Sequence, residues 1–302
     1  MSPSSRRPGA GWRALGLALL AALLPTCRRA ADAGAGYGQA PAQPAPPKPD
    51  RFQAAIAEGD RAFAERGEPD ELAAALAAYG RAAAERPGDA VAELRLARAE
   101  AFRGLSEAQA ARAQEAWQAS ARAAERALRR LAPAWAKAID QGEDPAGAAT
   151  RVDPPGAEAL YLLAQGVMRA AQANGYAAVL AVKDGALAMM TRAAELDERV
   201  DAAGPHRALG AWRAALPVAA GGGAGAARAH FEQARSLFPR DLLARVAEAE
   251  TLAVLVQDEE RFEALLREVI DADLSRDPGR APENRVARER ARALLARKAR
   301  LF

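Results

Sequence analysis

The chain has 302 residues, of which 50% are hydrophobic but only 5% aromatic, and its formal net charge is +3. Much of the hydrophobic fraction is alanine, which strongly favours helices, so the composition predicts an all-α protein. The net positive charge matches three arginines near the N-terminus, Arg6, Arg7 and Arg13, and without them the chain is neutral, which argues against a nucleic-acid-binding protein.

Residues 1–27 are predicted to be a secretory leader. The three arginines precede an 11-residue apolar run, Ala14–Leu24, which is too short to span a bilayer, for which about 20 residues are needed. Cys27, the only cysteine, follows this run where a lipoprotein leader places its acylated residue. We therefore expect Cys27 to carry a lipid that anchors the chain to a membrane. An ordinary secretory leader with an incidental cysteine is the alternative.

Residues 28–50 are rich in Ala, Gly and Pro and contain almost no bulky side chains. Such a segment cannot bury enough apolar surface to order itself, and its prolines favour extended conformations. We expect it to be a disordered tether. Residues 51–302 are then predicted to form one helical-repeat domain.

Residues 51–66 and 70–85 are predicted to form the first helical hairpin. In its second helix Tyr79 follows Ala75 by four residues and precedes Ala82 by three, and Pro87 lies five residues further on. This spacing is typical of the second helix of a tetratricopeptide hairpin. The small residues allow the two helices to approach closely, the aromatic ring fills the space between them, and the proline ends the helix.

Further helices are predicted at residues 90–103, then in a second segment that ends at about residue 130, and at residues 157–173 and 176–196. Ser106 is expected to cap the helix that ends near residue 130, with Gln109 completing a capping box. The Gly- and Pro-rich residues 142–156 are interpreted as a loop between repeats and not as a domain boundary. In the last of these helices the small–large–small spacing recurs at Ala186, Met190 and Ala193.

The clearest hairpin is predicted at residues 204–238, with a glycine-rich turn between its helices. Its packing positions are Leu209 and Gly210 in the first helix, and Ala227, Phe231, Ala234 and the terminating Pro239 in the second. Helices at residues 241–256, 259–273 and 283–302 complete the chain. Because one hairpin cannot bury its apolar face alone, three copies of the spacing predict tetratricopeptide-like hairpins stacked as an α-solenoid or bundle. An alanine-rich bundle in which the spacing recurs by chance is the alternative.

The sequence shows no recognisable catalytic, metal or cofactor site. His206 and His230 lie on different predicted helices, without Cys or His at ligand spacing, so no metal is expected. The glycine-rich segment Gly221–Gly225 lies between helices and lacks the Lys-Ser/Thr of a phosphate loop. With no visible set of acid, base and nucleophile, we expect a protein that is not an enzyme and needs no cofactor.

Large apolar side chains concentrate in the middle and C-terminal parts of the chain. Most are expected to pack between hairpins, but the interior of a helical array can also hold a ligand. The candidate ligand-binding residues are Met168, Tyr176, Met189, Met190, His206 and Trp212.

Four stretches, together with the C-terminal residues, carry a resemblance to a known family. They are AEALYLLAQGVMRAAQ (157–172), MTRAAELDERVDAAGPHRALGAW (190–212), ARAHFEQARSLF (227–238) and VQDEERFEALLREVIDAD (256–273). In this order, and on to the final Phe302, the chain from about Ala90 resembles the TRAP-transporter-associated T component (TatT), a family of tetratricopeptide-type periplasmic lipoproteins.

The resemblance implies helical hairpins, a homotrimer, and in each protomer a cavity suited to an apolar ligand. It also implies association with a periplasmic solute-binding protein, the P component, which serves a membrane permease. We therefore expect a lipid-anchored periplasmic transport accessory that holds or passes an apolar or amphipathic organic solute. The alternative is a cell-envelope scaffold lipoprotein whose tetratricopeptide surfaces bind only proteins.

Overall fold

Helix boundaries follow local capping signals in the sequence. In the computed structural model, which describes residues 50–302, Asp50, Asp89, Asp241 and Asp258 each accept a backbone N–H at the start of a helix. Proline occupies the first turn of several others, where its missing N–H costs nothing. The predicted leader, its acylation site at Cys27 and residues 28–49 of the predicted tether lie outside the described residues.

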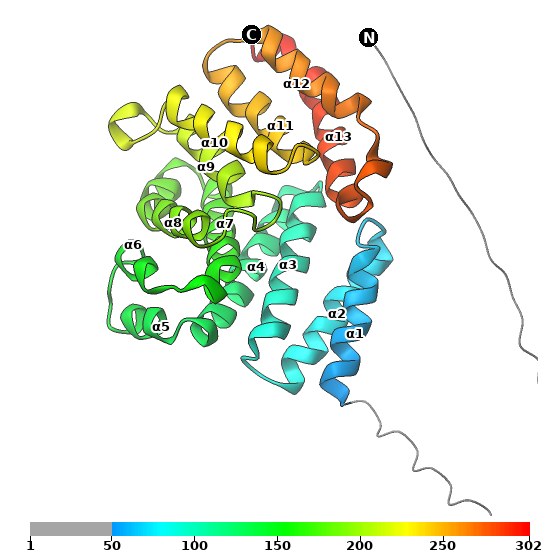
Figure 1. The fold of residues 1–302 in the computed structure, drawn as a ribbon, viewed down its shortest axis with the longest axis vertical. Helices are drawn as coiled ribbons and strands as arrows, with labels where there is room; N and C mark the ends of the chain where they lie inside the picture. The colour runs from blue at the N-terminus through cyan, green and yellow to red at the C-terminus, as the bar shows by residue number, and fades with distance from the viewer. Residues whose placement is uncertain (1–49) are drawn as a thin grey trace, which may run out of the picture. The chain divides into compact units, whose positions relative to one another are not determined.

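The described part of the chain, residues 50–302, is all-α, as predicted, and belongs to one compact unit. Its helices, shown in Figure 1, are α1 (Arg51–Ala64), α2 (Pro69–Glu85), α3 (Ala90–Ser106), α4 (Ala110–Leu131), α5 (Pro133–Asp140), α6 (Pro145–Ala148), α7 (Ala157–Ala173), α8 (Tyr176–Leu196), α9 (Gly204–Ala215), α10 (Ala224–Leu237), α11 (Leu242–Glu248), α12 (Glu259–Asp271) and α13 (Ala281–Leu295). None of the helices within residues 50–302 is both long and apolar enough to cross a membrane.

Three local predictions need correction. Ser106 is the last residue of α3, and its hydroxyl donates to the carbonyl of Phe102 at 3.0 Å instead of capping α4. The α4 helix begins after Gln109, which makes no side-chain cap, so the capping box is wrong. Residues 142–156 are not a plain loop, because they contain α6 and two 3₁₀ turns.

Consecutive helices pack against each other in pairs, α1 with α2, α3 with α4, α7 with α8, and α9 with α10. The α9–α10 pair shows how the spacing in the sequence produces a close approach. Phe231 is fully buried, and a Cβ added at Gly210 would lie 2.9 Å from its ring. The other small and large residues of the repeated spacing are also buried, namely Ala75, Tyr79, Ala82, Ala186, Met190, Ala193, Leu209, Ala227 and Ala234. Pro87 and Pro239 follow the ends of α2 and α10.

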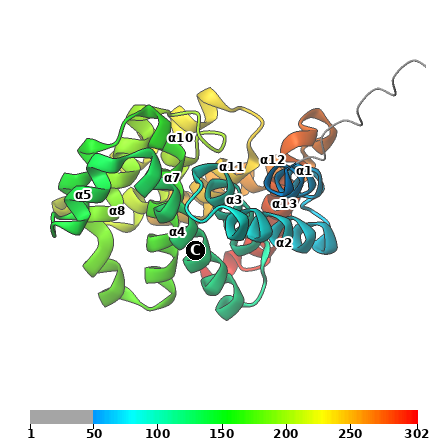
Figure 2. The same ribbon diagram turned by 90° about the horizontal axis from the view of Figure 1, so that it is seen from below.

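The first and last helical hairpins of the described chain meet. Helix α13 contacts α3, and both ribbon views place it beside the turn between α1 and α2 (Figures 1 and 2). The largest apolar core lies around α4, α7, α8 and α9, a second around α11–α13, and a third in α1–α3. The array thus closes on itself, and a cavity lies among these groups of helices.

Candidate functional site

A cavity of about 810 Å³ lies at the centre of the helical array. Helices α3, α4, α7, α9, α11 and α13 all contribute side chains to its wall. This volume falls within the range of small-molecule sites, which is about 300–1,000 Å³. The cavity is therefore large enough for a small organic molecule.

Helix α7 divides its residues between the core and the cavity. Leu160, Leu163 and Met168 are buried in the main core, as the predicted amphipathic pattern requires. The opposite face lines the cavity with polar side chains, among them Gln165 and Arg169. Because a helix repeats every 3.6 residues, one apolar stripe fixes the direction of both faces.

Helix α11 continues as a π-helical turn at Ala249–Ala253. Glu250 and Thr251 of this turn line the cavity, together with Val246 and Leu243, which lie one and two turns earlier. Single π turns within helices are frequent at functional sites, because the extra residue changes the direction of the side chains that follow.

Trp117 and Trp212 supply much of the apolar wall, and Phe63 and Phe102 line the end formed by α1 and α3. Their side chains are fixed by packing, since both tryptophans and Phe102 are buried. The cavity thus combines aromatic and aliphatic surface with charged groups, as expected for a site that binds an amphipathic molecule.

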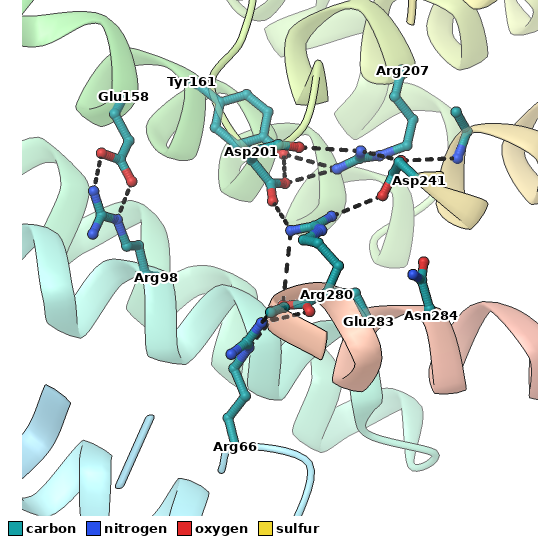
Figure 3. A network of polar contacts seen from close by, with 12 residues as sticks. Arg66, Arg98, Glu158, Tyr161, Asp201, Arg207, Asp241, Arg280, Glu283 and Asn284 are labelled. Carbon is teal, nitrogen blue, oxygen red and sulfur yellow. Dashed lines mark hydrogen bonds and ion pairs between the residues drawn. The ribbon is translucent and has the colours of Figure 1, made fainter. Parts of the chain in front are cut away.

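A network of two arginines and two aspartates forms one side of the cavity (Figure 3). Arg207 on α9 donates to Asp201 at 2.7 Å and to Asp241 at 3.1 Å. Arg280 donates to the same two carboxylates, at 2.7 Å and 3.0 Å. Each charge therefore has two partners of opposite sign, which offsets the cost of removing these groups from water.

Tyr161 on α7 joins this network by donating its hydroxyl to Asp201 at 2.6 Å. Burial opposes ionisation of Asp201, but the positive charges of Arg280 and Arg207 outweigh it and hold the pKa of Asp201 well below its usual range. Burial and the charge of Asp201 raise the pKa of Tyr161 far above its usual value, so its hydroxyl stays protonated and donating.

The backbone that presents Asp201 is strained. Asp201, Ala202 and Ala203 have φ values of 46°, 52° and 59°, and non-glycine residues adopt this left-handed region at a cost of roughly 1 kcal/mol each. Gly204 follows, and a Cβ there would lie 2.6 Å from the Tyr161 hydroxyl oxygen. This segment thus brings the Asp201 carboxylate and the start of α9 directly against Tyr161.

A second ion pair connects the turn between α1 and α2 with α13 at the cavity wall. Arg66, just after α1, donates to both carboxylate oxygens of Glu283 on α13, at 2.8 Å and 2.6 Å, and to the carbonyl of Gly279 at 2.7 Å. Arg98 on α3 pairs in the same two-pronged way with Glu158 on α7. Bidentate pairs of this kind fix geometry as well as charge.

Of the six candidate ligand-binding residues from the sequence, only Trp212 lines this cavity. Met168, Met189 and Met190 are buried in the main core, and Tyr176, at the start of α8, is 72% exposed. His206 lies beside His230 on α10, away from the cavity wall. Met190 occupies the central position of a small–large–small spacing, which explains why it packs between helices.

The two histidines form a contacting pair, with tilted rings, that the sequence did not predict. Their Nδ1 atoms are 3.1 Å apart, and their ring centroids are 5.3 Å apart. One ring must therefore donate and the other accept, which requires at least one neutral histidine. Burial, followed by the proximity of His206 and Arg213, lowers the pKa of His230 to about 4. Burial also lowers the pKa of His206, although Glu198 at 3.6 Å opposes this.

We expect this pair to make stability fall as the pH falls. Below about pH 6.5 the unfolded chain binds a proton at His230 that the folded protein does not bind until about pH 4, and the lowered pKa of His206 acts in the same direction, so unfolding becomes more favourable across this window. After discounting for partial exposure, the loss is about 1–2 kcal/mol. Urea unfolding of the wild type and of His230→Gln at pH 7.5 and 4.5 measures it. Equal losses in the two proteins would contradict this prediction.

Within residues 50–302, no group of three or more His, Cys, Asp or Glu side chains is arranged to hold a metal ion. The charged residues of the cavity were missed by the sequence analysis because their partners lie far apart along the chain. One signal was visible. Glu158, Gln165, Arg169 and Gln172 form a polar stripe on α7, opposite its apolar stripe.

The family model of the TRAP transporter T component matches residues 72–302 of the chain. A comparison with curated proteins found no match. The matched range runs from α2 to the last residue and includes every cavity-lining residue except Phe63 and Arg66.

Proposed function

Because the chain belongs to the TRAP transporter T-component family and is thus an accessory of a TRAP-type transport system, we propose that it binds an amphipathic organic solute in its central cavity. The observation that carries this proposal is the cavity itself. It has about 810 Å³ of space and a wall of aromatic, aliphatic and charged side chains, which is the composition of a small-molecule site.

We further propose that the chain works in the periplasm, anchored to a membrane by a lipid on Cys27. Its partner would be the solute-binding P component, and three copies of the chain would form the working assembly. These points follow from the family and from the leader-like residues 1–27. Exposed apolar side chains on the folded unit, Tyr176 and Val218 at 72% and 79% exposure, are compatible with such protein contacts.

Native mass spectrometry of the purified full chain tests the solute role. We expect an additional small-molecule mass on the wild type. Ala211 on α9 lines the cavity, so Ala211→Trp should fill part of the space and remove that mass. Ala177 on α8 is exposed and lies outside the cavity wall, so Ala177→Trp is the matched control and should keep it.

Circular dichroism establishes that both variants are folded. A wild type that carries no small molecule would contradict the solute role and favour the scaffold alternative, in which the helical surfaces bind proteins only. The same experiment gives the number of copies in the assembly, and a monomer would contradict the proposed trimer.

A further inference from the structure

Arg169 on α7 differs from every other arginine that lines the cavity. We propose that its guanidinium is the anion-binding group of the cavity, and that the solute is an amphipathic organic acid with a single carboxylate. This inference rests on the proposed function, since it assigns the chemical class of the solute held in that cavity.

The first argument is an inventory of charges. Within residues 50–302, five cavity-lining arginines have carboxylate partners: Arg66 with Glu283, Arg98 with Glu158, Arg207 and Arg280 with Asp201 and Asp241, and Arg290 with Glu250. Arg169 has no carboxylate within 4.0 Å and no hydrogen-bond acceptor among these residues. The remaining carboxylate of the wall, Asp197, accepts the backbone N–H of Arg199 at 2.9 Å. Asp197 keeps its charge, so the formal charges of this set balance, but Arg169 is the one arginine of the wall that has no carboxylate partner among residues 50–302.

The second argument is the surroundings of this charge. Arg169 keeps part of its surface accessible, and because protein atoms surround the side chain, that part faces the cavity. Burial, with a further contribution from the charge of Arg290 that exceeds the opposing effect of Glu250, lowers the pKa of Arg169 to about 10, so the group is still cationic at neutral pH. A desolvated cation without a partner is costly, and an anion in the cavity would offset that cost.

The third argument is the geometry of the donors. The guanidinium carbon of Arg169 lies 5.8 Å from the centre of the Trp117 ring. A cation–π contact of this kind is an attraction to the ring face and uses no hydrogen-bond acceptor, and no acceptor within residues 50–302 takes up the N–H groups of this guanidinium. Two parallel N–H groups match the two oxygens of a carboxylate.

The fourth argument sets the number of charges and the rest of the solute. Only one arginine is uncommitted, so one negative charge can be neutralised, and a second would compete with the carboxylates already paired. Much of the remaining wall is apolar, including Leu162, Ala208, Trp212 and Val246. A monocarboxylate with a hydrocarbon body matches this arrangement better than a dianion or a neutral molecule.

Calorimetric titration of the full chain with three probes tests the inference. The probes are decanoate, the neutral 1-decanol and the dianion decanedioate. We expect the wild type to bind decanoate most tightly, and Arg169→Gln to weaken decanoate binding about 10- to 100-fold while leaving 1-decanol unchanged. Arg169→Lys should retain part of the affinity, because lysine keeps the positive charge but lacks the two parallel N–H donors of the guanidinium. The exposed Arg112, outside the cavity, provides the control Arg112→Gln, which should bind as the wild type does.

A second readout excludes a purely structural role for Arg169. Removing an unpaired, desolvated charge should leave the thermal midpoint unchanged or raise it, whereas losing a structural arginine would lower it. A lowered midpoint for Arg169→Gln would therefore count against the inference, as would unchanged decanoate affinity in this variant.

The outcomes separate the inference from the proposed function. If 1-decanol binds the wild type as tightly as decanoate and Ala211→Trp blocks both, the cavity holds a solute but the assigned class is wrong. If decanedioate binds most tightly, the single-charge assignment is wrong. If no probe binds and the purified chain carries no small-molecule mass, the proposed function fails and the inference fails with it.

Discussion

Replacing Arg207 with leucine is expected to lower the free energy of unfolding by about 3–5 kcal/mol. Arg207 is buried and donates to both Asp201 and Asp241, and the Asp241 side chain is only 1% exposed. Leucine would leave two carboxylates facing the single arginine Arg280. The pKa of Asp201 would rise as a result, because one of the two charges that hold it down would be lost.

The measurement is urea unfolding followed by circular dichroism at pH 7. Arg81→Leu is the matched control, because Arg81 forms an exposed pair with Glu58 in which both side chains are about half exposed. Such pairs contribute about 0–1 kcal/mol. If the two variants lose the same free energy, the buried network does not contribute to stability as proposed.

Replacing Phe231 with alanine is expected to lower the free energy of unfolding by about 3–5 kcal/mol. The ring is fully buried between α9 and α10, and it packs near Ala214, Ala227 and Leu252. Because Gly210 has no side chain to fill the vacated space, the helices can close the cavity only by moving. Phe231→Leu keeps most of the volume and should cost less than about 1.5 kcal/mol.

The same unfolding experiment checks this prediction. Phe238, immediately after α10, offers a matched control because it is only partly buried and lies under Arg199. Its replacement by alanine should cost about 1–2 kcal/mol. A loss at Phe231 no larger than that at Phe238 would show that the α9–α10 contact is not the main packing contact of this hairpin.

The sequence predicted those parts of the fold that depend on neighbouring residues. The bounds of α7 and α8 agree with the predicted ranges because strong apolar periodicity is interrupted at Asn174 and Gly175. The α5 helix was missed, since its eight residues are too few to show a period clearly. The π turn after α11 was also missed, because it depends on packing within the whole array.

The cavity was far less predictable than the helices. Arg66 and Glu283 are 217 positions apart, and Arg280 and Asp201 are 79 apart. Nothing local selects one carboxylate from the 39 acidic residues of the chain as the partner of a given arginine. Trp212 was identified by its size, but the methionines chosen on the same grounds point into the core. The helix face on which a residue lies sets the direction of its side chain, and this direction would have identified cavity-lining residues better than side-chain size did.

The contact between the α1–α2 turn and α13 has a consequence for the order of folding. Most helices contact their neighbours in sequence, and such low-contact-order arrangements form fast. Closing the 217-residue loop between Arg66 and Glu283 costs only about 2 kcal/mol more in chain entropy than closing a 20-residue hairpin. It still requires α13, which leaves the ribosome after the other α-helices of residues 50–302. A nascent chain that stops before α13 has most of its hairpins but lacks Glu283 and Arg290, so the wall of the central cavity is completed only after the other hairpins have been made.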